Sequence, residues 1–254
     1  MKLSKESLRL LVSAPSHYAS RLARTPGEIQ AAQALRFQVF NLELNEGLNR
    51  SYATGLDADP FDAVCDHLIV EHVATGEVVG TYRMQTGLRA AKTLGYYCAQ
   101  EFHFDVFEPG RDKILELGRA CVHRQHRNLL VLGLLWKGIA DYASERGARY
   151  LIGCSSLTSQ DPAAGASAYS ELCRNHLAAP AWRTTPLPTH AVPLEVVTEE
   201  PVSIPKLLRA YLTIGGKICG PPALDAQFKT IDFLTLLDIE ALPAATRERF
   251  FGGS

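Results

Sequence analysis

The feature that most constrains the fold of this chain is an apolar run that ends in a basic turn and leads directly into a helix-like run. Residues 114–127 read Ile-Leu-Glu-Leu-Gly-Arg-Ala-Cys-Val-His-Arg-Gln-His-Arg, and Val131–Ser144 is rich in helix-forming apolar residues. We therefore expect a strand, a basic turn and a helix in succession. Because a helix N-terminus presents free N–H groups and a positive dipole end, such a unit can hold the phosphate of a carrier. Glu116 lies where it can accept a proton, so the pattern suggests group transfer from a phosphate-bearing carrier.

Composition bounds the partners of the chain. Its 254 residues are 46% hydrophobic with a formal net charge of −1, and non-specific nucleic-acid binding needs a basic surplus that is missing here. The six cysteines form no Cys-x-x-Cys pair, and His123 and His126 have no partner at ligand spacing, so we expect no metal site. No run of 18 apolar residues and no signal-peptide core occurs near the start. We expect a cytoplasmic protein, with peripheral contact at the inner membrane face left open.

Charge is distributed unevenly along the chain. Residues 43–71 contain seven acids and one base, whereas residues 124–149 contain five bases and two acids. The first region favours a cationic partner and the second an anionic one. Solvated surface charge explains any single member of either region equally well.

The order of apolar runs and turn formers predicts one α/β domain. We expect a long loop over Gly47–Asp66 and the following elements: helices at Glu28–Leu44, Val131–Ser144, Pro162–Leu177 and Ile204–Gly215; strands at His67–Val73, Val78–Thr86, Ile114–Val122, Tyr150–Leu157 and Thr230–Leu237; extended pieces at Arg183–Thr185 and Leu194–Val197. The division we expect is an N-terminal arm (1–25), a core (26–200) and a C-terminal helix–strand extension packed on the core (201–254).

Four short motifs resemble a known branch of the GNAT acyltransferase superfamily. They are Leu35-Arg36-Phe37-Gln38-Val39-Phe40, Asp59-Pro60-Phe61-Asp62, Gly80-Thr81-Tyr82-Arg83 and Glu116-Leu117-Gly118-Arg119. Their order and spacing resemble acyl-homoserine-lactone synthases, long-chain N-acyl amino acid synthases and bacterial L-ornithine Nα-acyltransferases of ornithine-lipid synthesis. Residues 134–139, 204–217 and 225–233 are more similar to the ornithine acyltransferase and hemolysin-like subgroup. The resemblance spans about residues 18–240 and implies a GNAT-like mixed, mostly antiparallel central sheet flanked by helices.

The basic turn departs from the pattern of acetyl-CoA-using GNAT enzymes, whose phosphate loop carries glycines that let the backbone approach a pyrophosphate. Arg124–Leu129 contains no glycine. Basic side chains suit acyl carrier protein, which has a single phosphodiester and an acidic docking surface; acyl-CoA stays open as the donor. The candidate carrier-binding residues are Val122, His123, Arg124, Arg127 and Asn128. We expect no cofactor besides this acyl-thioester cosubstrate.

Acyl transfer to an amine needs a base, and Glu116 is the candidate. An α-amine, with a pKa of about 7.7–8.0 at a chain terminus, must lose a proton before it attacks a thioester. Glu116 can accept that proton directly or through water, with Arg119 as the second candidate catalytic residue. The alternative is that Glu116 pairs with Arg119 or Arg83 only to stabilise the strands. The resemblance favours the role in the cleft.

The candidate substrate-binding residues are Arg36, Phe40, Asp59, Asp62, Arg83 and Ser155. Asp59 and Asp62 can hold a substrate ammonium, anchor their loop to the two arginines, or form the turn beside Pro60. We expect the arginines, the aspartates and Glu116 to form one connected set that shapes the acceptor pocket, because buried charges are costly unless fully paired.

The remaining chemical roles concern the oxyanion, the departing thiolate and the nucleophile. The resemblance implies that backbone N–H groups around Cys121–His123 stabilise the oxyanion. Ser155 or Tyr169 is a candidate to protonate the departing thiolate. Neither Cys121 nor Cys154 has an evident base beside it, so direct attack by the amine is favoured over a covalent intermediate. The apolar residues of Leu130–Trp136 are expected in the core, with one flank free to line an acyl tunnel.

The expected activity is transfer of a long-chain fatty acyl group, 3-hydroxylated or not, from acyl carrier protein to the α-amine of an amino acid. L-Ornithine is the leading acceptor because the acidic segment 43–71 favours a dicationic substrate and because of the resemblance of the tail. Acylation of a neutral amino acid and autoinducer synthesis are alternative reactions. A carrier-protein or lipid-binding module with a degenerate site is the alternative from another class.

Overall fold

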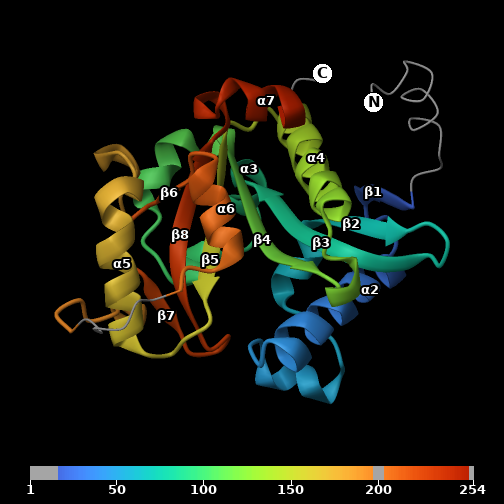
Figure 1. Cartoon of the computed structure of the whole chain (residues 1–254), viewed down its shortest axis with the longest axis horizontal. Helices are drawn as coiled ribbons and strands as arrows, with labels where there is room; N and C mark the ends of the chain where they lie inside the picture. The colour runs from blue at the N-terminus through green and yellow to red at the C-terminus, as the bar shows by residue number, and fades with distance from the viewer. Residues whose placement is uncertain (1–16, 197–202, 252–254) are drawn as a thin grey trace, which may run out of the picture.

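The computed structural model describes residues 17–196 and 203–251 and contains one open sheet with helices on both faces (Figure 1). The strand order is β1-β2-β3-β4-β5-β8-β6, with β7 on β8, and every pair is antiparallel except β4–β5. The strands are β1 (Tyr18–Leu22), β2 (Asp66–His72), β3 (Glu77–Thr86), β4 (Ile114–Val122), β5 (Tyr150–Leu157), β6 (Lys217–Ile218), β7 (Ala223–Asp225) and β8 (Thr230–Asp238). The predicted α/β fold with a mixed, mostly antiparallel sheet is confirmed.

Helices cover the sheet, and α2 and α4 lie on opposite faces of β2 and β3 (Figure 1). The α-helices are α2 (Pro26–Phe37), α3 (Gly87–Ala90), α4 (Leu129–Arg146), α5 (Pro162–His176), α6 (Lys206–Thr213) and α7 (Ala244–Phe251). The shorter helical turns are η1 (Gln38–Glu43), η2 (Asn49–Ala53), η3 (Pro60–Ala63), η4 (Cys98–Gln100), η5 (Asp105–Lys113), η6 (Arg124–His126), η7 (Pro180–Trp182), η8 (Pro188–His190) and η9 (Ile239–Ala241).

Local signals in the sequence explain where the main helices begin and end. Thr25 and Glu28 form a capping box at the start of α2, with Pro26 in its first turn, an arrangement that satisfies otherwise orphaned N–H groups. Asn128 caps α4, and Gly147 ends it in the left-handed region at φ 64°, where glycine has no steric penalty.

Two predicted segments differ from the structure. The helix expected over Glu28–Leu44 is α-helical only to Phe37 and continues as the π-helical turn η1, a rare geometry that is frequent at functional sites. The extended pieces expected in the proline-rich segment form no strand among the described residues, and Val197 lies outside them. Residues 1–16 of the predicted arm also lie outside the described residues, whereas its last part forms the edge strand β1.

The parallel strands β4 and β5 separate soon after they begin (Figure 1). They pair at only three positions, the last being Glu116 with Ile152. Just beyond this point the backbones are still close, since a Cβ on Gly153 would lie 2.2 Å from the carbonyl oxygen of Leu117. From there to their ends the two strands have no ladder between them. We call this opening the β4–β5 seam.

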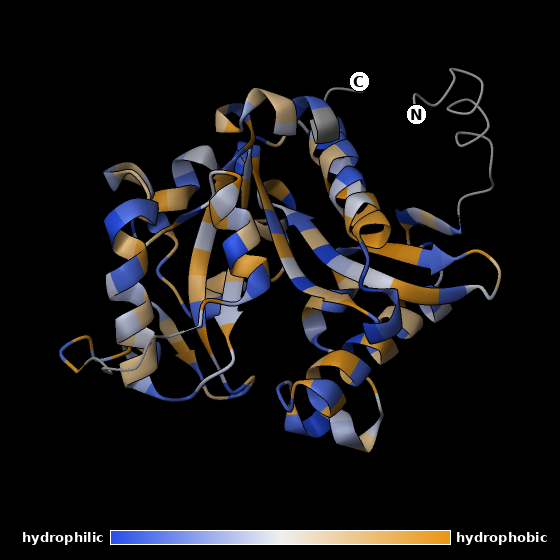
Figure 2. Ribbon diagram, viewed as in Figure 1, coloured by the Kyte–Doolittle hydropathy of each residue, from blue (hydrophilic) through white to orange (hydrophobic). Residues whose placement is uncertain are grey.

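The C-terminal strands belong to the same sheet. Strand β8 pairs with all eight positions of β5, so the division predicted at residue 200 does not coincide with a break in the sheet. Apolar strands lie between more polar helices, as the hydropathy colouring shows (Figure 2). Ile152 and Leu234 contribute to one core cluster, and Leu157 and Phe233 to another.

The start of α4 corrects a prediction about the core. Val131, Leu135 and Trp136 are buried, but Leu130 and Leu132 are 50% and 37% exposed. Leu129 is 82% exposed, and the apolar end of α4 stands out in Figure 2. Only one flank of this apolar run is therefore buried against the core. No helix among the described residues is both long and apolar enough to cross a membrane.

Candidate active site

Three arginines and three aspartates form a closed ring of ion pairs beside the β4–β5 seam. Around the ring, the pairs are Arg36–Asp57 (3.0 Å), Asp57–Arg119 (3.2 Å), Arg119–Asp59 (2.8 Å), Asp59–Arg83 (2.6 Å), Arg83–Asp62 (3.0 Å) and Asp62–Arg36 (2.7 Å). All six side chains are at least 92% buried. The ring brings together helix α2, the acidic loop and strands β3 and β4. We call these six residues the Arg–Asp ring.

The ring changes the role expected for the acidic loop. Burial alone would raise the pKa of Asp62, but its bonds to Arg36 and Arg83 outweigh burial and hold the pKa well below its usual range. Asp59 likewise contacts two guanidinium groups. Both carboxylates are therefore already neutralised, and the prediction that they hold a substrate ammonium is wrong. Their alternative role, anchoring the loop to the arginines, is confirmed.

The acidic segment as a whole is paired in the same way, so its excess charge does not attract a cationic substrate. Glu43 pairs with Arg127, Asp66 with Arg89, and Glu71 with Arg21. Glu46 is the exception, since it makes no ion pair with a described residue and lines the main cavity. Asp225 and Asp232 also line that cavity and add to its negative charge.

The ring arginines keep donors for a ligand. Nε and Nη2 of Arg119 contact Asp57 and Asp59, and Nη2 also donates to Tyr97. The guanidinium stacks on the rings of Tyr97 and Phe228, and its Nη1 makes no hydrogen bond or ion pair with a described residue. Arg83 contacts both of its aspartates through Nη1. Both arginines line the main cavity. A guanidinium with unused N–H groups is suited to bind a carboxylate.

Glu116 points into the same cavity and is 4% exposed. Its Oε2 accepts hydrogen bonds from Gln85 Nε2 (2.6 Å) and the Tyr97 N–H (2.9 Å), and its Oε1 accepts from the Cys98 N–H (2.9 Å). Glu116 makes no ion pair with Arg83 or Arg119, so the expected link between Glu116 and the arginines is wrong. Each carboxylate oxygen accepts two hydrogen bonds, and Oε1 therefore has one site left.

Two cavities meet at the seam. The larger, of about 330 Å³, lies on the face that carries Glu116 and Arg83, and the smaller, of about 60 Å³, lies on the face of α4 and α6. Both are lined by Leu117, Gly118, Arg119, Ala120, Cys154, Ser155 and Leu207. Phe40 lines the larger cavity, whereas Tyr169 packs in a core cluster and lines neither. Of the two candidate thiolate acids, only Ser155 lies at the seam.

A β-bulge lies where the two cavities meet, two residues before the expected oxyanion site. The register between β3 and β4 shifts so that Tyr82 opposes both Arg119 and Ala120, and Arg119 has φ 50°. A bulge leaves one residue unpaired in the ladder. The N–H of His123, by contrast, donates to the Val79 carbonyl. The predicted oxyanion donor is therefore wrong at His123, and the bulge takes its place as the candidate.

The thiols are poor nucleophiles. Burial raises the pKa of Cys121 to about 12. A hydrogen bond from Cys154 to Cys98, together with burial, raises the pKa of Cys154 well above its usual value. A protonated thiol is a weak nucleophile, which agrees with direct attack by an amine.

The basic turn is more internally bonded than the sequence predicts. Arg127 donates to Glu43 (2.7 Å from Nη2) and to the Val122 carbonyl. The side chain of Asn128 accepts from the N–H groups of Leu130 and Val131. The expectation of free N–H groups at the start of α4 is wrong at these two positions, because the cap already satisfies them.

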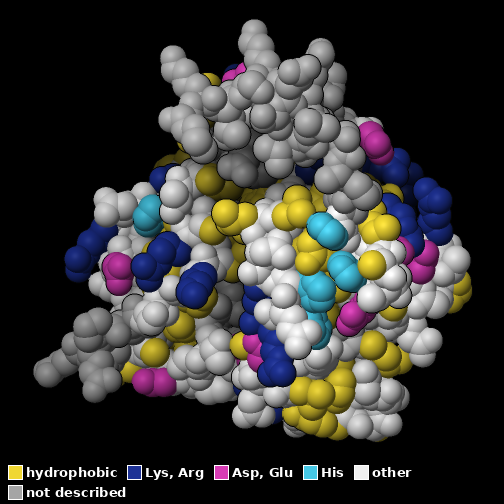
Figure 3. Space-filling view, turned by 45° about the vertical axis from the view of Figure 1, so that its right-hand side comes forward, with side chains coloured by type: hydrophobic (Ala, Val, Ile, Leu, Met, Phe, Trp, Pro, Cys, Tyr) yellow, Lys and Arg dark blue, Asp and Glu magenta, His cyan; other side chains and the backbone are white. Residues whose placement is uncertain are grey.

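One cation of the turn stays available. Arg124 is exposed and makes no ion pair with a described residue, and His123, 8% exposed, contacts Gln38. The ring centroid of His126 lies 5.4 Å from that of His72 and 5.4 Å from that of His123. Figure 3 shows histidines gathered on one face beside hydrophobic and basic side chains.

Sequence reasoning missed a group of acids in and beside the larger cavity. Glu46, Asp225 and Asp232 line it, and Glu101 lies next to Asp232. Burial raises the pKa of Glu46, Glu101 and Asp232. Glu101, Cys154 and Asp232 also form the one group of three potential metal ligands among the described residues, within 4.8 Å of one another. An aspartate inside the apolar run Thr230–Leu237 was the available signal.

Comparison of the sequence with known proteins identifies the family of this chain. Residues 35–137 match the Acetyltransferase (GNAT) domain family. The L-ornithine N(alpha)-acyltransferase of Brucella abortus (strain 2308) is 34% identical over 237 residues, which cover 87% of this chain and 84% of the relative. This chain belongs to the L-ornithine Nα-acyltransferase family. It is an acyltransferase, as predicted.

Solved structures support the fold of this family member. The AHL synthase LasI aligns with a TM-score of 0.54 at 13% identity, covering 94% of this chain and 97% of LasI. FeeM, an N-acyl amino acid synthase from uncultured soil microbes, aligns with a TM-score of 0.54 at 12% identity, covering 88% and 91%. This chain therefore shares its fold with both kinds of synthase.

Proposed function

We propose that the protein transfers a long-chain fatty acyl group from a carrier thioester to the α-amine of L-ornithine. The observation that best supports this is the β4–β5 seam, where cavities on opposite faces of the sheet share the backbone of Leu117–Ala120. A thioester can enter from the face of α4 and an amino acid from the face of Glu116. The names of the relatives support ornithine as the acceptor.

The acceptor binds by its carboxylate first. The unused donors of Arg119 and Arg83 line the larger cavity, and the Arg–Asp ring fixes both guanidinium groups before the substrate arrives. Such pre-organisation lowers the entropy lost on binding. The α-amine then lies toward Glu116 and the seam.

The chemistry is a direct aminolysis. Glu116 takes a proton from the α-ammonium through the free site on Oε1, and the neutral amine attacks the thioester carbonyl carbon. The oxyanion forms beside the bulge at Arg119 and Ala120, where backbone donors stabilise it. The C–S bond breaks as the amide forms, and the nitrogen loses two protons in all: the one held by Glu116 returns to the thiolate beside Ser155, and the other passes to solvent.

The donor we propose is acyl carrier protein. Arg124 supplies an exposed cation to an acidic partner, and Leu129 and Leu130 supply an exposed apolar surface beside it. An acyl chain on ornithine gives an amphiphilic product, the lyso-ornithine lipid of ornithine-lipid synthesis. The same leucines suit contact with the inner membrane face, where such a product partitions.

Purified protein tests this function directly. It is incubated with acyl carrier protein or CoA thioesters of several chain lengths, with and without a 3-hydroxyl group, and with ornithine, lysine, glycine and tyrosine. Mass spectrometry is expected to detect Nα-acylornithine as the main product, with the carrier-protein donor preferred. Absence of any N-acyl amino acid with every donor would refute the proposal.

A further inference from the structure

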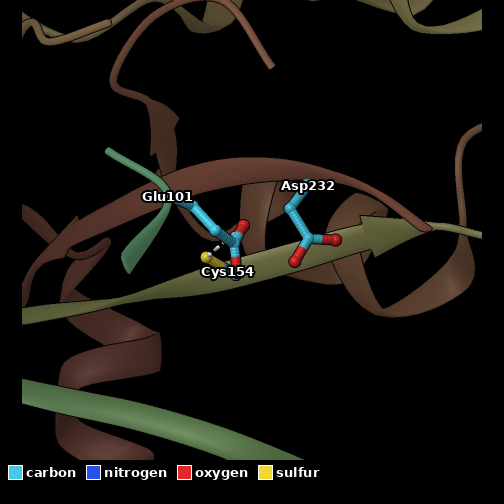
Figure 4. Close-up of side chains that lie close together, drawn as sticks. All are labelled: Glu101, Cys154 and Asp232. Carbon is cyan, nitrogen blue, oxygen red and sulfur yellow. Dashed lines mark hydrogen bonds between the residues drawn. The ribbon is translucent and has the colours of Figure 1, made fainter. Parts of the chain in front are cut away.

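Glu101, Cys154 and Asp232 converge on one point at the β8 side of the larger cavity (Figure 4). They come from three segments: the end of turn η4, strand β5 and strand β8. Glu101 is 3% exposed and Asp232 5% exposed, and the thiol of Cys154 contacts Glu101 Oε2 at 3.9 Å. Two buried carboxylates therefore lie next to each other, with the Cys154 sulfur beside the carboxylate of Glu101 (Figure 4).

Neither carboxylate has a cationic partner. No described Lys, Arg or His forms an ion pair with Glu101 or Asp232, in contrast to the three aspartates of the Arg–Asp ring. Asp232 lines the larger cavity, and no described residue hydrogen-bonds its Oδ1. An unpaired buried charge is costly and is retained mainly where a ligand completes it.

Neighbouring groups add to the negative field. Burial raises the pKa of Asp232, and the charges of Asp225 and Glu46 raise it further. Burial and the charge of Asp232 likewise raise the pKa of Glu101. Two neighbouring buried acids favour holding a proton between them, and a bound cation replaces that proton.

We infer that this cluster is the subsite for the side-chain ammonium group of the acceptor amino acid. This inference rests on the proposed function and names the group that selects a diamino acid. An alkylammonium has one positive charge and three N–H donors, which match the carboxylates of Asp232 and Glu101 and a third acceptor on the wall, such as Asp225.

The chemistry of the cluster favours an ammonium over a metal ion. Hard cations such as Ca²⁺ and Mg²⁺ take six or more oxygen ligands, and here the third group is a thiol.

The subsite also explains which amine reacts. Arg119 and Arg83 hold the carboxylate end of the substrate, and Asp232 holds its far end. The δ-nitrogen is then kept charged and away from the seam, whereas the α-nitrogen lies beside Glu116. The product is therefore acylated at the α-nitrogen.

Replacement of Asp232 by Asn tests the subsite with two acceptors. L-Norvaline has the carbon chain of L-ornithine without its δ-amine, so kcat/KM for the two reports on the ammonium alone. Wild type is expected to prefer ornithine. In Asp232→Asn, kcat/KM for ornithine falls by about 10²-fold, as expected for loss of one member of a buried charge pair. The kcat/KM of Asp232→Asn for norvaline stays within about threefold of wild type, because norvaline has no ammonium group for Asp232 to bind.

Asp238→Asn is the matched control, since Asp238 lies on the same strand and pairs with Arg149 outside the cavities. Glu101→Gln is a second variant in case Asp232→Asn does not fold, and it is expected to show the same split between acceptors. As a readout without turnover, ornithine should raise the melting temperature of wild type more than the same concentration of norvaline does.

The outcomes separate the two proposals. If wild type acylates no amino acid, the proposed function fails. If wild type acylates ornithine but uses norvaline equally well, or if Asp232→Asn loses both acceptors equally, the subsite is refuted and the acyltransferase stands. Stoichiometric zinc or magnesium bound by wild type and lost in Asp232→Asn would also overturn the inference, because the cluster would then be a metal site.

Discussion

Arg119 donates to Asp59 across 2.8 Å from a backbone position at φ 50°. This conformation costs a non-glycine residue about 1–3 kcal/mol and persists only where its surroundings fix it. The ion pairs of Arg119 supply that constraint, so the Arg–Asp ring and the bulge of β4 depend on each other. Charge pairing beside the seam thereby shapes the backbone at which the oxyanion forms.

Removal of one ring carboxylate should destabilise the fold. Asp62 pairs with Arg36 and Arg83, and Asp62→Asn leaves both with less than their full set of partners. We predict a loss of about 3–5 kcal/mol in the free energy of unfolding at pH 7, the range for a broken buried ion pair. Urea denaturation measures it. The control Asp141→Asn breaks an exposed pair with Lys137 and should cost no more than about 0.5 kcal/mol.

The same variant has a defined pH dependence. Because the pKa of Asp62 is lower in the folded protein than its usual value, its contribution is complete above the unfolded pKa of about 3.9 and is lost as the pH falls below it. The stability gap between wild type and Asp62→Asn should therefore narrow in acid. A gap that stays constant from pH 7 to pH 3 would contradict this origin.

Glu101→Gln should have the opposite effect on stability. The pKa of Glu101 is raised by burial and by Asp232, so its favourable contribution is present below the unfolded pKa, about 4.3, and is lost as the pH rises through the folded value. Asp232, Asp225, Cys154 and Arg119 are the charged or titratable groups that face it. We predict that Glu101→Gln melts at a higher temperature than wild type at pH 8 and at a similar one at pH 4. An equal difference in melting temperature between wild type and Glu101→Gln at pH 4 and pH 8 would contradict the presence of two unpaired acids.

Glu116→Gln separates a base from a structural carboxylate. Wild-type Oε1 accepts the Cys98 N–H, and the variant amide must place its NH₂ group at one of the acceptor positions, so some loss of stability is expected. A base role also predicts a fall in kcat of about 10²–10⁴-fold near pH 7. This deficit should shrink as the pH rises past the pKa of the substrate α-amine, because the amine then arrives deprotonated; in a free amino acid this pKa lies above the value of about 7.7–8.0 for a chain terminus. A deficit independent of pH would indicate a structural role alone.

Arg124→Glu tests carrier docking. Arg124 is the cation of the turn that has no described ion-pair partner, so reversing its charge should repel an acidic carrier. We predict a rise of about tenfold in KM for the acyl carrier donor at low salt, with kcat nearly unchanged and the effect weaker at high salt. Arg174→Glu, on the exposed face of α5, is the matched control. Equal effects of the two variants would show that only net charge matters.

The sequence predicts much of this fold because its strands are short apolar runs between turn formers. Tyr150–Leu157 is found with the predicted bounds, and Ile114–Val122 likewise. Strand β6 has only two residues, too few to give a periodic signal. The π-helical turn η1 is invisible for another reason, since its apolar spacing is close to that of an α-helix.

The site is predicted in part, and the misses have a physical cause. Arg36, Arg83 and Glu116 stand out because they are charges inside apolar patterns. Asp57 lies in a polar loop, where nothing distinguishes a buried aspartate from a solvated one. Ion pairing between residues far apart in the chain decides which acids stay free, and no local pattern encodes that pairing. The sequence therefore points to the acidic loop as the source of a free negative charge, whereas in the structure Asp232 and Glu101 supply it.

Closing the β4–β5 seam tests the account most directly. Gly118 lines both cavities, and a Cβ placed on it meets no atom within 4 Å, so Gly118→Leu should fill the opening without disturbing the fold. Gly133→Leu adds the same side chain on α4, where space is also free and neither cavity is lined. We predict that Gly118→Leu forms N-acylornithine at a steady-state rate about 10²-fold or more below that of wild type, as misplaced reactants imply. Its melting temperature should equal that of wild type. Gly133→Leu should keep the wild-type rate. A folded Gly118→Leu protein that acylates ornithine at the wild-type rate would show that the reaction takes place elsewhere.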